Sequence, residues 1–158
     1  MSGSPRIMVL VALLAGVVAL GACGGEADSR KEKNSYIREL NAAQQEFATN
    51  ASRVSTQGKA ASLGQYRKTL QRFEDTITTF EAKLRDIKVP SVVEDEHKQL
   101  IAALTQFGED FEAVTGVLNN PNARALSEAQ NSITVATQRA NSRIEAAAAA
   151  IDSKLRDS

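Results

Sequence analysis

The sequence predicts an all-α protein, folded as an antiparallel up-down-up-down four-helix bundle with heptad-like seams. Four segments carry apolar residues at alternating steps of three and four, which places those side chains on one face of a helix. Only short, turn-like segments separate them, and short connections favour antiparallel neighbours. No segment shows the alternation of apolar and polar residues that is typical of a strand. At 158 residues, one domain is expected.

Residues 1–22 have the layout of an export signal. One cation, Arg6, precedes an uncharged apolar run over residues 7–20, and the small residues Gly21 and Ala22 follow it. The run is too short for a helix that spans a bilayer, which needs roughly 20 apolar residues. Cys23 comes next and is the only cysteine of the chain.

The residues Leu20-Gly21-Ala22-Cys23 resemble the lipobox of bacterial lipoproteins. The resemblance implies cleavage between Ala22 and Cys23 and a diacylglyceryl group on the Cys23 sulfur. It also implies an extracytoplasmic protein that is lipid-anchored to the bacterial cell membrane, or to the outer membrane if the source has two membranes. Two acyl chains give stable anchoring. The alternative is an uncleaved N-terminal anchor with an incidental cysteine.

In this interpretation, residues 23–34 are the lipidated cysteine and a flexible tether. Residues 24–34 are polar, mixed in charge and nearly devoid of apolar side chains, so they cannot bury enough surface to order themselves. The alternative is that the second half of this segment continues into the first helix.

The first two helices are expected over residues 35–57 and 63–88. Gly58 provides a natural stop for the first helix. Ser62 and Gln65 have the spacing of a capping box, and Pro90 ends the second helix because the residue before a proline disfavours helical backbone. The expected core residues are Tyr36, Leu40, Ala43, Phe47 and Val54 in the first helix, and Leu63, Tyr66, Leu70, Phe73, Ile77, Phe80, Leu84 and Ile87 in the second.

The other two helices are expected over residues 92–118 and 123–156, joined by a turn at residues 119–122. Ser91 and Glu94 again have capping-box spacing. The stripe of the last helix is rich in alanine, which would allow close approach to its neighbours. The expected core residues are Val93, His97, Leu100, Leu104, Phe107, Phe111, Val114 and Leu118 in the third helix, and Leu126, Ala129, Ile133, Ala136, Ala140, Ile144, Ala147, Ile151 and Leu155 in the fourth.

A row of polar side chains lies beside the apolar stripe of the last helix. It consists of Gln130, Thr134, Thr137 and Asn141. We interpret this row as a solvated face, with the alternative that it lines a pocket or is a face for a partner protein.

His97 is the only histidine of the chain, and this excludes most metal chemistry known in helical bundles. Glu94 and His97 have Glu-x-x-His spacing, but a di-iron bundle needs two such motifs. Zinc sites normally use several histidine or cysteine ligands. We therefore expect no metal, no cofactor and no catalytic residue, and we interpret His97 as a seam-end or capping residue.

The charges balance, with 19 basic and 19 acidic residues. This argues against nucleic acid, because its binding proteins carry basic patches. Acidic residues gather in the third helix, where we expect pairing with neighbouring helices. The alternative is two acidic clusters that bind cations or a basic partner.

The function expected from these features is a non-enzymatic binding or scaffold module. It would present helix faces to an envelope protein or a cell-wall polymer. The alternatives are an envelope protein that binds a small ligand or a cation, or an enzyme whose site is not recognisable. The oligomeric state stays open.

Overall fold

The computed structural model describes residues 27–57, 63–118 and 123–158, and they form four long helices. These are α1 (Ala27–Gln57), α2 (Leu63–Asp86), α3 (Glu94–Val117) and α4 (Ala123–Asp157), with a short 3-10 helix, η2 (Ser91–Val93), before α3. No strand occurs in these three ranges. Outside them lie the predicted signal peptide, the lipobox with Cys23, Gly58, the Ser62 cap and the turn at residues 119–122.

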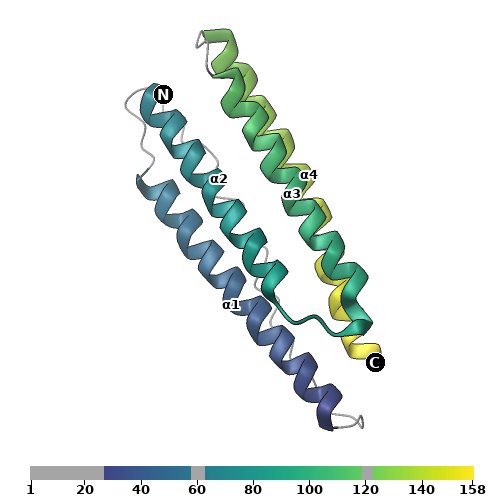
Figure 1. Cartoon of the computed structure of the whole chain (residues 1–158). Helices are drawn as coiled ribbons and strands as arrows, with labels where there is room; N and C mark the ends of the chain where they lie inside the picture. The colour runs from purple at the N-terminus through teal and green to yellow at the C-terminus, as the bar shows by residue number, and fades with distance from the viewer. Residues whose placement is uncertain (1–26, 58–62, 119–122) are drawn as a thin grey trace.

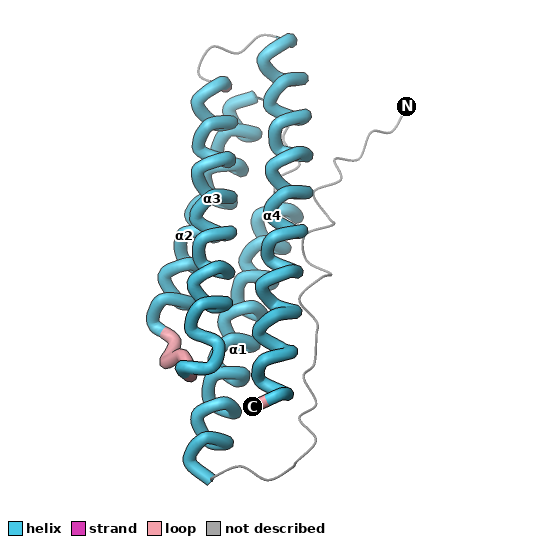
Figure 2. Tube along the Cα trace, turned by 90° about the vertical axis from the view of Figure 1, so that its right-hand side faces the viewer, coloured by secondary structure: helices cyan, strands magenta, loops and turns pink. Residues whose placement is uncertain are grey.

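The helices lie side by side along a common direction and alternate in sense, as the sequence predicts (Figure 1). The start of α1, the connection at residues 87–93 and the end of α4 share one end of the bundle, which we call the base. At the base, α1 extends beyond the other helices, as both views show (Figures 1 and 2). The predicted four-helix bundle is therefore confirmed.

The neighbouring helices do not pack equally closely. Within the described residues, the backbones of α3 and α4 approach each other over the longest stretch, followed by those of α2 and α3 and of α1 and α2. The backbones of α1 and α4 make few approaches within 8 Å. Ala136, Ala140 and Ala147 of α4 are buried, and such small side chains allow neighbouring helices to approach closely. The side of α4 that points away from α3 and toward α1 is called the α1–α4 side below.

The predicted apolar seams form the core. Nearly all of the expected seam residues with described side chains are buried, and Leu40, Val54, Tyr66 and Ile133 are partly buried against them. The phenylalanines link three helices: Phe73 of α2 lies with its ring centroid 6.4 Å from that of Phe47 and 5.1 Å from that of Phe111. Phe47 also stacks on Phe80, with centroids 4.7 Å apart. The aromatic rings are therefore core residues and not a stacking surface for a ligand.

The start of α1 differs from the predicted one. The helix begins at Ala27 and not at Ser35, so the expectation of a flexible tether through residue 34 is wrong, and the alternative of a continued helix is right. Arg, Lys and Glu are good helix formers, and they dominate this segment. Glu32 also lies 3.8 Å from the Lys88 ammonium of the α2–α3 connection, which supports these turns from outside the helix.

The connection between α2 and α3 also departs from the prediction. The helix α2 ends at Asp86, and η2 occupies Ser91–Val93, so α3 begins at Glu94. The expected capping box of Ser91 and Glu94 is wrong, because neither η2 nor α3 has a side-chain cap. The Glu94 carboxylate instead accepts a hydrogen bond from Lys98 at 2.7 Å, one turn further along the same helix.

Phe73→Ala should lower the free energy of unfolding by about 3–5 kcal/mol, the usual cost of removing a buried phenylalanine. The reason is that Phe73 contacts rings from both α1 and α3. Chemical denaturation followed by circular dichroism measures the change. Gln71→Ala, at an exposed position of α2, is the control and should change the value by less than about 0.5 kcal/mol. Equal effects of the two substitutions would contradict the proposed core.

Candidate functional site

The most polar part of the buried interior lies at the base, around His97 of α3. The His97 side chain is only 3% exposed. Its Nε2 lies 2.9 Å from the Leu84 carbonyl oxygen of α2. Because a carbonyl oxygen can only accept, Nε2 carries the proton and donates. The Nδ1 atom of the neutral ring is then an acceptor, and the Tyr36 hydroxyl of α1 donates to it at 3.0 Å.

Through its Nε2 hydrogen bond, His97 provides a partner for a carbonyl group at the end of α2. Leu84 lies in the last turn of α2, whose carbonyl groups have no partner within the helix. Its oxygen accepts from the His97 ring and also from the Ile87 amide at 3.2 Å. The expectation that His97 is a seam-end or capping residue is confirmed, since the ring lies in the seam of α3 and caps α2.

The fourth helix joins this cluster through an ion pair. Glu96 of α3, 8% exposed, accepts a hydrogen bond from the Lys154 ammonium in the last turn of α4 at 2.7 Å. The other carboxylate oxygen, Oε2, is buried without a hydrogen-bond partner among the described residues. We call Tyr36, the Leu84 carbonyl, Glu96, His97 and Lys154 the base cluster. It contains one group or more from each of the four helices.

Burial sets the protonation of His97 and Tyr36, and a hydrogen bond sets that of Glu96. Burial lowers the pKa of the His97 imidazole below its ordinary 6.5, and the hydrogen bond to the Leu84 carbonyl opposes this only in part. Burial also raises the pKa of the Tyr36 hydroxyl, and the negative charge of Glu96 adds to the shift. The hydrogen bond from Lys154 lowers the pKa of Glu96. At neutral pH, His97 and Tyr36 are therefore uncharged, while Glu96 and Lys154 form an ion pair.

The geometry of the base cluster suits structure better than catalysis. Both ring nitrogens of His97 already have hydrogen-bond partners, so neither is available to take a proton from a substrate or to bind a metal. The Glu94 carboxylate is occupied by Lys98 at the exposed surface, so the Glu-x-x-His motif does not converge. In the part of the chain that the structure describes, no three histidine, cysteine or acidic side chains are grouped to hold a metal ion.

The predicted polar row of α4 lies elsewhere on the molecule. Gln130 and Thr134 are exposed, and Thr137 and Asn141 are half-buried. At 3.6 residues per turn, the four side chains project roughly opposite Arg139, which pairs with Asp110 of α3 at 3.0 Å. The row therefore follows the α1–α4 side, away from α3. We call it the α4 flank.

The α4 flank and the base cluster are not brought together. His97 lies beside the last turns of α4, because its neighbour Glu96 pairs with Lys154. Asn141, the nearest flank residue, precedes Lys154 by roughly 20 Å along the helix axis. The structure thus separates a buried polar cluster from a solvent-accessible row of amides and hydroxyls. The sequence pattern indicated the row but held no signal for the partners of His97.

A shallow hollow of about 390 Å³ lies between α2 and α3. It is lined by Arg85, Lys98, Ile101, Ala102, Thr105, Gln106 and Glu109. Several of its polar groups are already engaged: Arg85 pairs with Glu81, Lys98 pairs with Glu94, and the Thr105 hydroxyl donates to Glu81 at 2.7 Å. These pairings leave the hollow with little capacity to bind a polar ligand.

The acidic residues of α3 pair partly with neighbouring helices, as expected. Asp110 binds Arg139 and Glu96 binds Lys154, both across the α3–α4 interface. Lys83 of α2 similarly pairs with Glu46 of α1.

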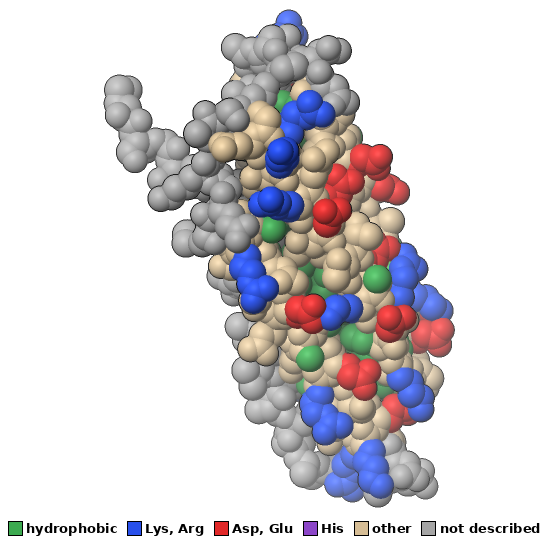
Figure 3. All heavy atoms as spheres, turned by 60° about the vertical axis from the view of Figure 1, so that its left-hand side comes forward, with side chains coloured by type: hydrophobic (Ala, Val, Ile, Leu, Met, Phe, Trp, Pro, Cys, Tyr) green, Lys and Arg blue, Asp and Glu red, His purple; other side chains and the backbone are tan. Residues whose placement is uncertain are grey.

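Glu74 of α2 lies close to other acids. Burial and the nearby charges of Glu112 and Asp75 raise the pKa of its carboxyl group. Figure 3 shows cations and acids spread over one face of the molecule, with hydrophobic atoms only in small spots.

Comparison of the chain with known protein families, with characterised proteins and with solved structures finds no match in any of the three. Within the described residues, no helix has the length and the apolar character that crossing a membrane requires.

His97→Gln should flatten the pH dependence of stability below about pH 6.5. The folded pKa of His97 lies below its ordinary value, so the unfolded chain binds more protons in this range, and stability is lost as the pH falls from 6.5 towards the folded pKa. Glu96 acts in a separate range, since its pKa is lowered from 4.5 and its stabilisation is lost only at more acidic pH. Urea denaturation at several pH values measures the stability of the wild type and of the variant. Parallel curves for the two proteins between pH 5 and about 6.5 would contradict this assignment.

Lys154→Ala should destabilise the protein more than Lys98→Ala. The first substitution leaves the buried Glu96 carboxylate without its ion-pair partner, and this should also raise the pKa of Glu96. The second removes an exposed pair with Glu94, and such pairs contribute less than about 1 kcal/mol. Urea denaturation compares the two variants, and carbon-detected NMR follows the titration of Glu96. Indistinguishable unfolding curves would refute the role of Lys154.

Proposed function

We propose that this protein is a lipid-anchored, non-enzymatic binding or scaffold module of the bacterial cell envelope. The resemblance of Leu20-Gly21-Ala22-Cys23 to a lipobox supports the anchor, which places acyl chains on the Cys23 sulfur and the bundle on the outer side of the cytoplasmic membrane. In a source with two membranes, the outer membrane is the second location. The partner is an envelope protein or a cell-wall polymer.

The α4 flank is the observation that carries the binding role. Its four side chains are uncharged hydrogen-bonding groups, spaced by one turn of helix over roughly 16 Å. Two of them, Gln130 and Thr134, are exposed, and the other two are half-buried. The backbone of α1 approaches α4 less closely than the backbone of α3 does. A row of amides and hydroxyls with solvent access suits a polar chain. The Thr134 hydroxyl donates to the Gln130 carbonyl oxygen at 3.0 Å and can still accept, and the side-chain amides of the row can both donate and accept.

The alternative functions draw less support from the described residues. A cation-binding role would need converging acidic ligands, and an enzyme would need a group free to transfer a proton. His97 has both nitrogens engaged, and several of the polar groups in the hollow between α2 and α3 are already paired. The α4 flank is therefore the face on which the proposal rests.

A photo-crosslinking residue at Thr134 should capture a defined partner in native membranes. The same residue at Gln71, an exposed polar position of α2, is the matched control and should not capture it. Thr137→Glu should reduce the adduct formed from Thr134, because a carboxylate would need desolvation at the contact. Identical adducts from both positions, or none from Thr134, would contradict the proposed face.

The proposed lipidation of Cys23 is tested by a separate measurement. Mass spectrometry of the mature N-terminus should find Cys23 as the first residue, carrying acyl chains. An unmodified Cys23 with residues 1–22 still attached would overturn the anchoring proposal and leave the α4 flank to be judged by the crosslinking result.

A further inference from the structure

The early start of α1 shortens the link between the proposed anchor and the bundle. Only residues 24–26 separate Cys23 from Ala27, the first residue of α1. A chain of this length spans at most about 14 Å, even when it is fully extended. The N-terminal end of α1, at Ala27, must therefore stay close to any bilayer that holds the acyl chains of Cys23. A flexible segment through residue 34 would have allowed the bundle to move far more freely.

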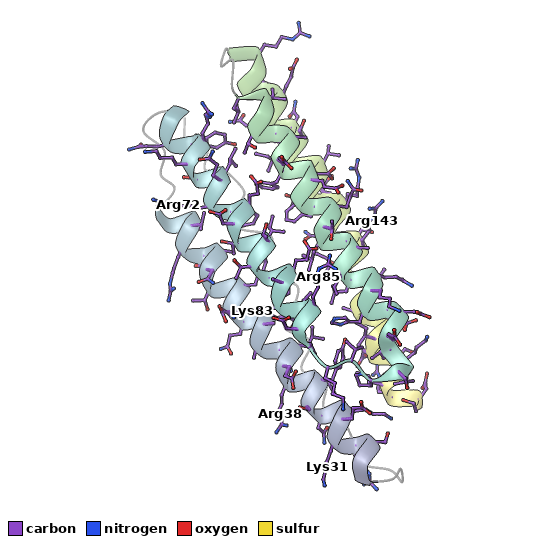
Figure 4. All side chains as sticks on the ribbon, viewed as in Figure 1. Lys31, Arg38, Arg72, Lys83, Arg85 and Arg143 are labelled. Atoms are coloured by element: carbon purple, nitrogen blue, oxygen red, sulfur yellow. The ribbon has the colours of Figure 1, made fainter. Side chains whose placement is uncertain are left out.

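The anchored end is also the part of the molecule that extends farthest at the base. There α1 projects beyond the other helices (Figures 1 and 2). Arg30 and Lys31 are exposed on this projection, and Figure 4 shows Lys31 at its lower end. Lys88 lies next to it, since its ammonium is 3.8 Å from Glu32. Among the described side chains, the charged residues of this region are Arg30, Lys31, Lys33 and Lys88 against the acid Glu32, and we call them the basic tip.

The described sides of the bundle offer no continuous apolar surface for lipid. The exposed large hydrophobic residues are Val117, 45% exposed, and Val135, 51% exposed, and they lie singly on α3 and α4. A helix that lies flat in the interface needs a continuous apolar face, which two isolated valines do not form. On the face seen in Figure 3, cations follow one edge of the upper half, acids gather beside them, and both signs mix in the lower half.

From these observations we infer that the basic tip contacts the anionic headgroups of the bilayer that holds Cys23. This inference rests on the proposed lipidation of Cys23. Each Lys or Arg close to an anionic surface adds attraction, so the tip is a second membrane signal beside the acyl chains. The base then faces the bilayer, and the long axis of the bundle points away from it. The α4 flank lies roughly 24–40 Å from the C-terminal end of α4, on the side away from the bilayer.

Fluorescence energy transfer to an acceptor lipid tests this orientation. The acylated protein, verified by mass spectrometry, is reconstituted in vesicles of phosphatidylcholine with about one third phosphatidylglycerol, an anionic lipid. A donor dye is placed on one new cysteine: Ser91→Cys at the base, Val135→Cys on the side or Gly116→Cys at the opposite end. All three positions are exposed, and a Cβ at Gly116 would meet no heavy atom within 4 Å. Because acylation blocks the Cys23 sulfur, each variant has one reactive thiol.

Transfer should be strongest from Ser91 and weakest from Gly116, which lie roughly 37 Å apart along α3. Replacing Arg30, Lys31 and Lys33 by Glu should remove this gradient, and so should vesicles of phosphatidylcholine alone. Glutamates near a helix N-terminus are favourable, so the variant should fold, and circular dichroism verifies this. Replacing Lys68, Arg72 and Arg143 by Glu makes the same change in net charge at exposed positions away from the tip (Figure 4) and should preserve the gradient.

Two results would overturn the inference. Equal transfer from the three positions in the wild type would show a bundle that lies on its side. A gradient that persists without anionic lipid and in the tip variant would show that headgroup contact does not orient the bundle. Failure of the anchor itself is separate, because the mass spectrum would then show Cys23 without acyl chains before any vesicle is made.

Discussion

Burial of one apolar seam per helix is the constraint on which the whole structure depends. The chain has a single cysteine, so no disulfide within one chain can stabilise the bundle, and packing must suffice. The aromatic rings carry much of this packing, since Phe47, Phe73 and Phe111 join α1, α2 and α3 in one continuous cluster. Helix α4 has no aromatic residue and contributes alanine and aliphatic side chains instead. Its smaller side chains allow the close approach seen between α4 and α3.

The base cluster adds a polar requirement to this apolar core. A buried polar group without a partner is costly, and His97 avoids that cost by binding α1 and α2 at once. A shift of α3 by one turn would separate its ring from the Leu84 carbonyl and from the Tyr36 hydroxyl. Glu96 would lose Lys154 in the same shift. The cluster therefore favours one alignment of the four helices, which apolar seams alone specify weakly because they repeat.

The two proposals assign different tasks to the two ends of the molecule. The base combines the basic tip and the hydrogen-bonded cluster with the proposed anchor at Cys23, so in these proposals it is the end with a fixed position at the bilayer. The α4 flank lies further along the bundle and has polar groups with solvent access. Helices that are continuous between these two regions make the distance between them nearly constant, which is useful in a scaffold.

The sequence by itself determined the four helices and their buried faces, because alternating steps of three and four specify a helix face without knowledge of its neighbours. It also placed His97 in a seam. For residues 27–34, helix propensity and the lack of apolar side chains pointed in different directions, and the structure decided for a helix that begins at Ala27. The tertiary structure also decided what periodicity cannot express: the pairing of His97 with Tyr36, 61 residues away in the chain, and the side on which the α4 flank lies. These features depend on contacts between helices, and such contacts exist only once the seams have brought the helices together.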